Sequence, residues 1–172
     1  QIDYLCCISN INYDNPEWVV PTITDGVPIF KAKNIGHPLL KKEKRVCNSL
    51  ELEEPKNIMI ITGSNMSGKS TLMRTVGINM VLAYAGSAVC ADEFYCTIMD
   101  IYSSMKISDD LNNGISSFYA EILKIKQITE ASKQGKQVFF LLDEIFKGTN
   151  SIDRHTGAMV LIKQLSKKGN LG

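Results

Sequence analysis

The sequence predicts an α/β fold in which a mostly parallel central sheet is flanked by helices. Residues 137–142 are apolar on both faces, a pattern typical of a central parallel strand covered by helices on both sides. A second apolar stretch, Ile58–Thr62, predicts another core strand, and it runs through a glycine-containing turn into a helical pattern. Strands that alternate with helices in this way favour a layered fold with parallel pairing.

Composition and charge exclude several classes of protein. The chain has 172 residues, a length typical of one domain with a substantial core. Apolar residues make up 44% and charged residues 22%, which excludes a disordered tail. The net charge of +1 gives no sign of a dominant nucleic-acid surface, and the apolar runs are too short to span a membrane. The first ten residues do not have the pattern of a secretory signal, and the starting Gln1 predicts an excised fragment.

Cysteine usage favours an intracellular protein. The five cysteines form no C-x-x-C pair, so the sequence predicts neither a zinc site nor a thioredoxin-like redox centre. We expect buried free thiols instead. This usage fits a reducing cytoplasm better than a secreted scaffold.

Three helices follow from apolar spacing and from their start and stop signals. The first is predicted over residues 69–84, with Gly86 ending it. Its buried face is predicted to carry Leu72, Val76, Met80 and Ala83. The second is predicted to begin near Ser116 or Ser117 and to end before Gly135, and the third to be capped by Asn150 or Ser151.

The first third of the chain is predicted to be peripheral. Residues 1–12 have the pattern of the last turns of a preceding helix, and residues 13–172 form the main domain. Pro16, Pro21 and Pro28 indicate short antiparallel strands and turns. Residues 41–45 are basic and predict a solvated loop, with a phosphate or DNA contact as the alternative. Trp18 is expected to pack beside Pro21, stacking on a base being the other possibility.

Residues 63–70 carry the strongest chemical motif. They match G-x-x-x-x-G-K-[ST] and lie between a predicted strand and a predicted helix. In such a loop the backbone N–H groups and the positive end of the helix surround a polyphosphate. A plain glycine-rich turn is the alternative. Lys69 would bridge the β- and γ-phosphates, and Ser70 would bind Mg²⁺. The nucleotide-binding candidates of this motif are Gly63, Ser64, Asn65, Met66, Ser67, Gly68, Lys69 and Ser70.

Two acids end the second apolar strand. Asp143 and Glu144 directly follow residues 138–142. Adjacent carboxylates at the end of a buried strand are costly unless a cation or a ligand uses them. We expect Asp143 to hold Mg²⁺ and Glu144 to act as the general base toward an attacking water. Solvated acids at a strand end are the alternative interpretation.

These segments together resemble the MutS family. The resemblance is carried by residues 62–71, by Asp109-Asp110-Leu and Ser116-Ser117-Phe-Tyr-Ala-Glu121, and by residues 142–150. His37-Pro38, Asn48 and residues 85–91 also match the family by position. The likeness covers nearly the whole chain, and its specificity lies in the order and spacing of the motifs.

The resemblance implies an ABC-like P-loop ATPase that binds ATP and Mg²⁺ and works as a homodimer or a paralogous dimer. Ser116 would be the signature serine that reaches the partner's γ-phosphate, although a helix cap explains it equally well. Asn65 and Thr71 would add polar contacts to phosphate, and Thr71 could instead face the core. Residues 148–150 and Asp153 would form a loop that links the two sites across the dimer. DNA would bind through domains outside this chain.

The match also departs from the family. Residues 145–155 differ from the Gly-Arg-Gly-Thr-like stretch of the mismatch-repair branch, which indicates a divergent branch. Nothing here resembles a mismatch-reading domain. The family's Thr-His switch would follow Gly172, so we expect a C-terminally incomplete domain with weak hydrolysis.

Two rival functions stay open. One is a nucleotide-gated dimerisation module with little turnover. The other is a P-loop kinase, which the scattered arginines Arg45, Arg74 and Arg154 disfavour because they form no lid-like cluster.

Overall fold

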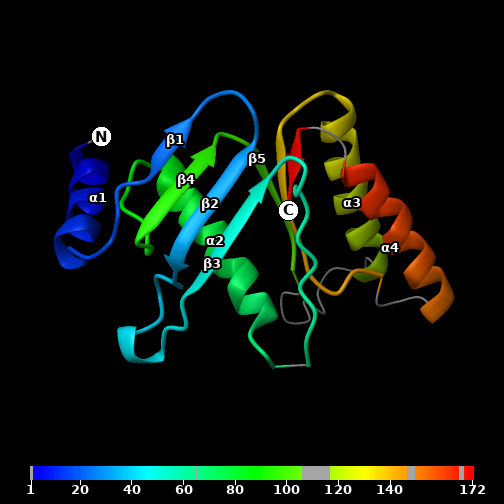
Figure 1. The fold of residues 1–172 in the computed structure, drawn as a ribbon, viewed down its shortest axis with the longest axis horizontal. Coiled ribbons are helices and arrows are strands. Elements are labelled where there is room, and N and C mark those ends of the chain that lie inside the picture. Colours follow the sequence, from blue (N-terminus) through cyan, green and yellow to red (C-terminus); the bar gives the residue numbers. More distant parts are fainter. Residues whose placement is uncertain (1, 65, 106–116, 147–149, 167–168) are drawn as a thin grey trace. The chain divides into compact units, whose positions relative to one another are not determined.

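A computed structural model describes residues 2–64, 66–105, 117–146, 150–166 and 169–172. The chain divides into two compact units, residues 1–98 and 99–172. Both contain helices and strands (Figure 1). None of the helices in the described ranges is long and apolar enough to cross a bilayer.

The first unit is built on a four-stranded mixed sheet in the order β1-β4-β2-β3. Strand β2 is antiparallel to both of its neighbours, and β1 is parallel to β4. The antiparallel pairing of β2 with β3 agrees with the antiparallel strands predicted for this part of the chain. The elements of this unit are α1 (Ile2–Asp14), β1 (Thr22–Thr24), β2 (Ile29–Ile35), the short 3-10 helix η1 (Lys42–Lys44), β3 (Asn48–Glu53), α2 (Lys69–Tyr84) and β4 (Glu93–Thr97).

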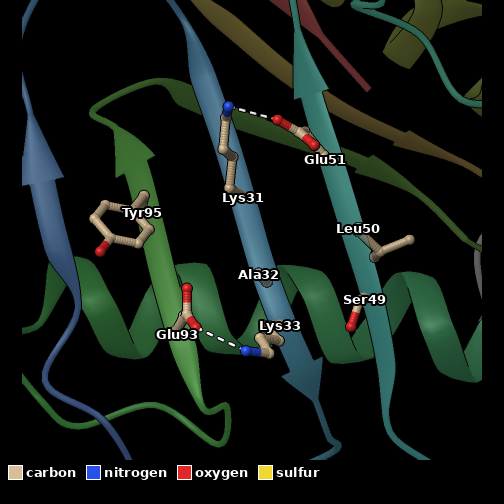
Figure 2. Close-up of a pocket in the computed structure, with 8 residues that line it drawn as sticks. All are labelled: Lys31, Ala32, Lys33, Ser49, Leu50, Glu51, Glu93 and Tyr95. Atoms are coloured by element: carbon tan, nitrogen blue, oxygen red, sulfur yellow. Dashed lines mark hydrogen bonds and ion pairs between the residues drawn. The ribbon is translucent and has the colours of Figure 1, made fainter.

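Helix α2 lies across one face of this sheet and forms the core with it (Figures 1 and 2). Val76, Met80 and Ala83 of the predicted stripe are buried, while Leu72 is half-buried. On the sheet, the rings of Phe30 and Phe94 meet edge to face with their centroids 5.4 Å apart. The helix ends where the glycine predicted it, because Gly86 adopts φ +80°, which suits a residue without a side chain.

A buried asparagine joins α2 to the sheet. The Asn79 side chain is fully buried, and its Nδ2 donates to the carbonyls of Gly36 at 3.0 Å and Thr75 at 2.8 Å. Its Oδ1 accepts from the Cys90 N–H at 2.8 Å. One side chain therefore satisfies backbone groups from two segments that flank the helix.

The second unit is a three-stranded parallel sheet in the order β5-β6-β7 with two helices. Strand β6 (Val138–Leu142) is central and parallel, as predicted, with neighbours β5 (Asp100–Ser104) and β7 (Asn170–Leu171). Helix α3 (Ser117–Lys133) packs on β5, on β6 and on α4 (Ser151–Leu165) (Figure 1). The buried helical side chains of this unit include Ile128 and Ala131 of α3 and Leu161 and Leu165 of α4.

The strand predicted over Ile58–Thr62 is wrong in this structure. Neither sheet of the described residues includes it, and Met59 and Ile60 are 38% and 67% exposed. An apolar run meets only the side-chain requirement of a strand, because the backbone N–H and C=O groups must also find a ladder partner. The P-loop NTPase arrangement of the sheet thus stays a prediction.

The thiols differ from expectation in burial. All five cysteines are free, but Cys6, Cys7 and Cys47 are exposed, and only Cys90 and Cys96 are buried. Two of the exposed thiols lie on α1, which has no buried residue and so offers no core to enter. The prediction of buried thiols therefore holds for two positions.

Burial should decide which cysteines react. Desolvation raises the pKa of the Cys96 thiol to about 11, and it also raises the pKa of Cys90. Because the thiolate is the nucleophile, we expect iodoacetamide at pH 8 to label the three exposed cysteines in the folded chain and the other two only in denaturant. Peptide mass spectrometry measures this. Equal labelling rates for Cys47 and Cys96 would contradict it.

Candidate functional site

The glycine-rich loop closes on the first residue of α2. The Lys69 ammonium donates to the carbonyls of Gly63 at 2.8 Å and Ser64 at 2.6 Å, and the Ser67 N–H donates to the Ser64 carbonyl at 3.3 Å. The loop is thus a tight turn with a cation held at its carbonyls.

Gly68 shows why a glycine is needed before α2. It is the N-cap residue, with φ 90° and ψ 7°, a left-handed conformation that side chains disfavour. Nothing lies within 4 Å of the position that a Cβ would take, so the backbone angle and not crowding selects glycine. No side chain caps the helix at Gly68, and the positive end of α2 therefore suits an anion.

Other predicted residues of this loop have different surroundings. Met66 is fully exposed and left-handed at φ 66°. Ser70 is half-buried at the start of α2, and Thr71 is exposed, so its core-facing alternative is not seen. Asn65 lies outside the described residues.

The acid pair follows β6, as the sequence predicts. The Asp143 N–H donates to the Ser104 carbonyl at 2.9 Å, which extends the β5-β6 pairing by one residue. Asp143 is half-buried and Glu144 is exposed. Glu144 and Phe146 have φ of 49° and 60°, a conformation that costs roughly 1–3 kcal/mol for a residue other than glycine. Strained backbone of this kind is common at functional sites.

The predicted loop after the acids is described in part. Residues 147–149 lie outside the described ranges, as do Ser116 and residues 109–114. Asn150 caps α4: its Oδ1 accepts from the Asp153 N–H at 2.9 Å, and its Nδ2 donates to Asp153 Oδ2 at 2.8 Å. Of the two predicted caps, Asn150 is therefore the one used.

The donor atoms suit Mg²⁺. A serine hydroxyl and an aspartate carboxylate are hard oxygen ligands, which Mg²⁺ prefers, and it commonly completes its shell with phosphate oxygens. Within the described ranges no three His, Cys, Asp or Glu residues gather into a metal cage. Ser70 and Asp143 therefore each offer an oxygen ligand of the kind that Mg²⁺ prefers.

A separate shallow cavity of about 350 Å³ lies on the face of the four-stranded sheet opposite α2 (Figure 2). Its charges pair with each other: Lys31 Nζ lies 2.5 Å from Glu51 Oε1, and Lys33 Nζ lies 2.9 Å from Glu93 Oε1. The hydrogen bond between Lys31 and Glu51 lowers the pKa of the Glu51 carboxyl and raises the pKa of the Lys31 ammonium. Such exposed pairs contribute little to stability, and none of the motif residues lines this cavity.

The basic segment, residues 41–45, is solvated as predicted, but Lys42–Lys44 form the 3-10 helix η1 and not a plain loop. Arg45 donates through Nε and Nη2 to the Leu40 carbonyl at 3.2 and 2.8 Å. Its guanidinium carbon lies 5.7 Å from the centroid of the Trp18 ring. Trp18 therefore packs against an arginine.

Comparison with known proteins places these motifs in a family. Residues 59–171 match the family described as MutS domain V. Several similar proteins are named DNA mismatch repair protein MutS: that of Caldicellulosiruptor bescii is 33% identical over 100% of this chain and 20% of its own length. Those of Fusobacterium nucleatum subsp. nucleatum and Pseudothermotoga lettingae are 38% and 37% identical over 79% and 89% of this chain, and over 15% and 19% of their own lengths.

These matches define the class of protein as one that contains MutS domain V. The chain belongs to the MutS family. It spans about a fifth of the length of the curated relatives it matches.

Proposed function

We propose that the chain forms the ATP-binding and ATP-hydrolysing part of a MutS-family protein. The observation that carries the proposal is the loop before α2, where the Lys69 ammonium lies within 2.8 Å of the carbonyls of Gly63 and Ser64. The helix that follows has no side-chain cap at Gly68. A polyphosphate placed there would meet a lysine, backbone N–H groups and the positive end of a helix.

The proposed reaction is transfer of the γ-phosphoryl group to water, which requires positioning and charge stabilisation and no covalent intermediate. Lys69 would balance charge on the β- and γ-phosphates. Glu144 would accept a proton from the attacking water. Mg²⁺, when bound by the Ser70 hydroxyl and the Asp143 carboxylate, would neutralise phosphate charge. The proposal requires that both motifs serve the same nucleotide.

The family supports a wider role for the nucleotide. In the proposal, ATP favours closure of a homodimer or a paralogous dimer, with Ser116 of one subunit reaching the γ-phosphate held by the other. This closure would change how the intact protein holds DNA through its other domains. The similar proteins are named as DNA mismatch repair proteins, which supports DNA as the partner.

The test compares Glu144→Gln with the unchanged intact protein. We expect the variant to bind Mg²⁺-ATP with similar affinity and to lower the single-turnover hydrolysis rate by about 100-fold or more, because an amide cannot accept the proton. Sedimentation should show ATP-dependent dimers that persist in the variant.

Glu130→Gln is the matched control, since Glu130 is exposed on α3 and lies 3.7 Å from Lys126 in a surface ion pair. It should leave hydrolysis unchanged. ATP binding without turnover by the unchanged protein would favour the dimerisation module, and a phosphorylated small-molecule product would identify a kinase. Absence of ATP binding would reject the proposal.

A further inference from the structure

The backbone that carries Glu144 is held by contacts from two helices, α3 and α4. Glu144 and Phe146 are both left-handed, with φ of 49° and 60°. Such a conformation persists only when its surroundings enforce it. The groups that contact Phe146 therefore constrain the turn from which the Glu144 side chain extends.

The first contact comes from α3. The Phe146 N–H donates to Glu121 Oε1 at 2.6 Å, a short bond to a group that carries charge when ionised. Glu121 is half-buried in the second turn of α3, 25 residues earlier in the chain. A helix that packs on β5 and β6 thus supplies an acceptor to the turn that follows β6.

The second contact comes from α4. Gly157 faces the ring of Phe146 so closely that an added Cβ would lie 3.2 Å from Cε2, 3.4 Å from Cδ2 and 3.5 Å from Cζ. Glycine is an unfavourable residue inside a helix, and here it makes room for this ring. Phe146 is therefore held through its backbone by α3 and through its side chain against α4.

We propose that Glu121 is a positioning residue for ATP hydrolysis: through the Phe146 N–H, and together with Gly157, it fixes the turn that aims the Glu144 carboxylate at the attacking water. This inference rests on the proposed function. Glu121 touches neither nucleotide nor water in this role. It acts on the rate because small displacements of a catalytic group have large kinetic effects.

The role depends on the acceptor oxygen of Glu121 and not on its charge. A glutamine keeps an oxygen at the same position, whereas alanine removes it. If Glu121 acted only through its negative charge near the N-terminus of α3, glutamine and alanine would lower the hydrolysis rate equally, because both remove the charge.

The experiment measures single-turnover ATP hydrolysis and ATP affinity in the intact protein for Glu121→Ala, Glu121→Gln, Gly157→Ala and Glu130→Ala. We expect Glu121→Ala to lower the hydrolysis rate by on the order of 10- to 100-fold with less than a threefold change in affinity. Glu121→Gln should recover the rate to within about threefold, and the exposed Glu130→Ala should match the unchanged protein.

Gly157→Ala keeps the inference testable if Glu121→Ala folds poorly. Alanine favours the helix, so thermal unfolding should not shift downward, while its methyl group presses on the Phe146 ring and lowers the rate by roughly three- to tenfold. In the Glu121→Ala, Gly157→Ala double variant, the hydrolysis rate should fall by less than the product of the two single-variant factors, because both substitutions act through Phe146.

The outcomes separate this inference from the proposed function. Hydrolysis by the unchanged protein that needs Glu144 but is unaffected by Glu121→Ala and Gly157→Ala would overturn the inference alone. Equal loss in Glu121→Ala and Glu121→Gln would also overturn it. An unchanged protein that neither binds nor hydrolyses ATP would overturn the proposed function and the inference with it.

Discussion

Replacing Lys69 with alanine is expected to weaken binding of Mg²⁺-ATP by on the order of 100-fold, equal to about 2.8 kcal/mol at about 1.4 kcal/mol per tenfold. The ammonium donates to the carbonyls of Gly63 and Ser64 in this loop. Charge-assisted hydrogen bonds to phosphate are among the strongest that a side chain can make. Isothermal titration calorimetry with ATP measures the change.

The fold should survive this substitution, because among the described residues the Lys69 ammonium donates to carbonyls of the loop, Gly63 and Ser64. Thermal unfolding without nucleotide should therefore be unchanged. Lys124→Ala, which removes an exposed lysine of α3, is the matched control and should bind ATP normally. Equal affinity in Lys69→Ala and in the control would show that the loop does not hold the phosphates.

Replacing Asn79 with alanine is expected to lower the free energy of unfolding by about 3 kcal/mol. The substitution leaves the Gly36 carbonyl and the Cys90 N–H buried without their partner, and each such group costs about 1–3 kcal/mol. It also opens a small void beneath α2. Urea denaturation followed by circular dichroism measures the loss.

Asn10→Ala provides the comparison, since Asn10 is an exposed asparagine in α1. This change should stay within about 0.5 kcal/mol of the original chain. A loss of the same size in both variants would show that the Asn79 bridge does not stabilise the fold.

The sequence was most informative where one local signal decided the structure. Helix α2 occupies the predicted residues 69–84, because the glycines at both ends need left-handed backbone and the apolar spacing fits one buried face. Strand β6 was predictable for a related reason. A strand that is apolar on both faces is stable where both faces are covered, as in the centre of a parallel sheet.

Local signals failed where the outcome depended on distant partners. Residues 58–62 have the side chains of a strand, but pairing depends on a second segment that the run itself does not specify. Asn79 lies in a helical stripe and gives no hint that it bridges Gly36 and Cys90. The loop motif and the acid pair were predictable from spacing, whereas the Glu121 contact to Phe146 joins residues 25 positions apart and has no local pattern.

The attachment of α1 has a mechanical consequence. Its Tyr4 hydroxyl donates to the Ala85 carbonyl, and its Asn12 Oδ1 accepts from the Ala88 N–H at 3.0 Å, both just beyond the end of α2. Helix α1 has no buried residue. Helix α2 has 16 residues and is therefore about 24 Å long, with the glycine-rich loop directly before its first turn. A force applied to α1 would therefore be transmitted through these two hydrogen bonds to the C-terminal end of α2, and through α2 toward the loop.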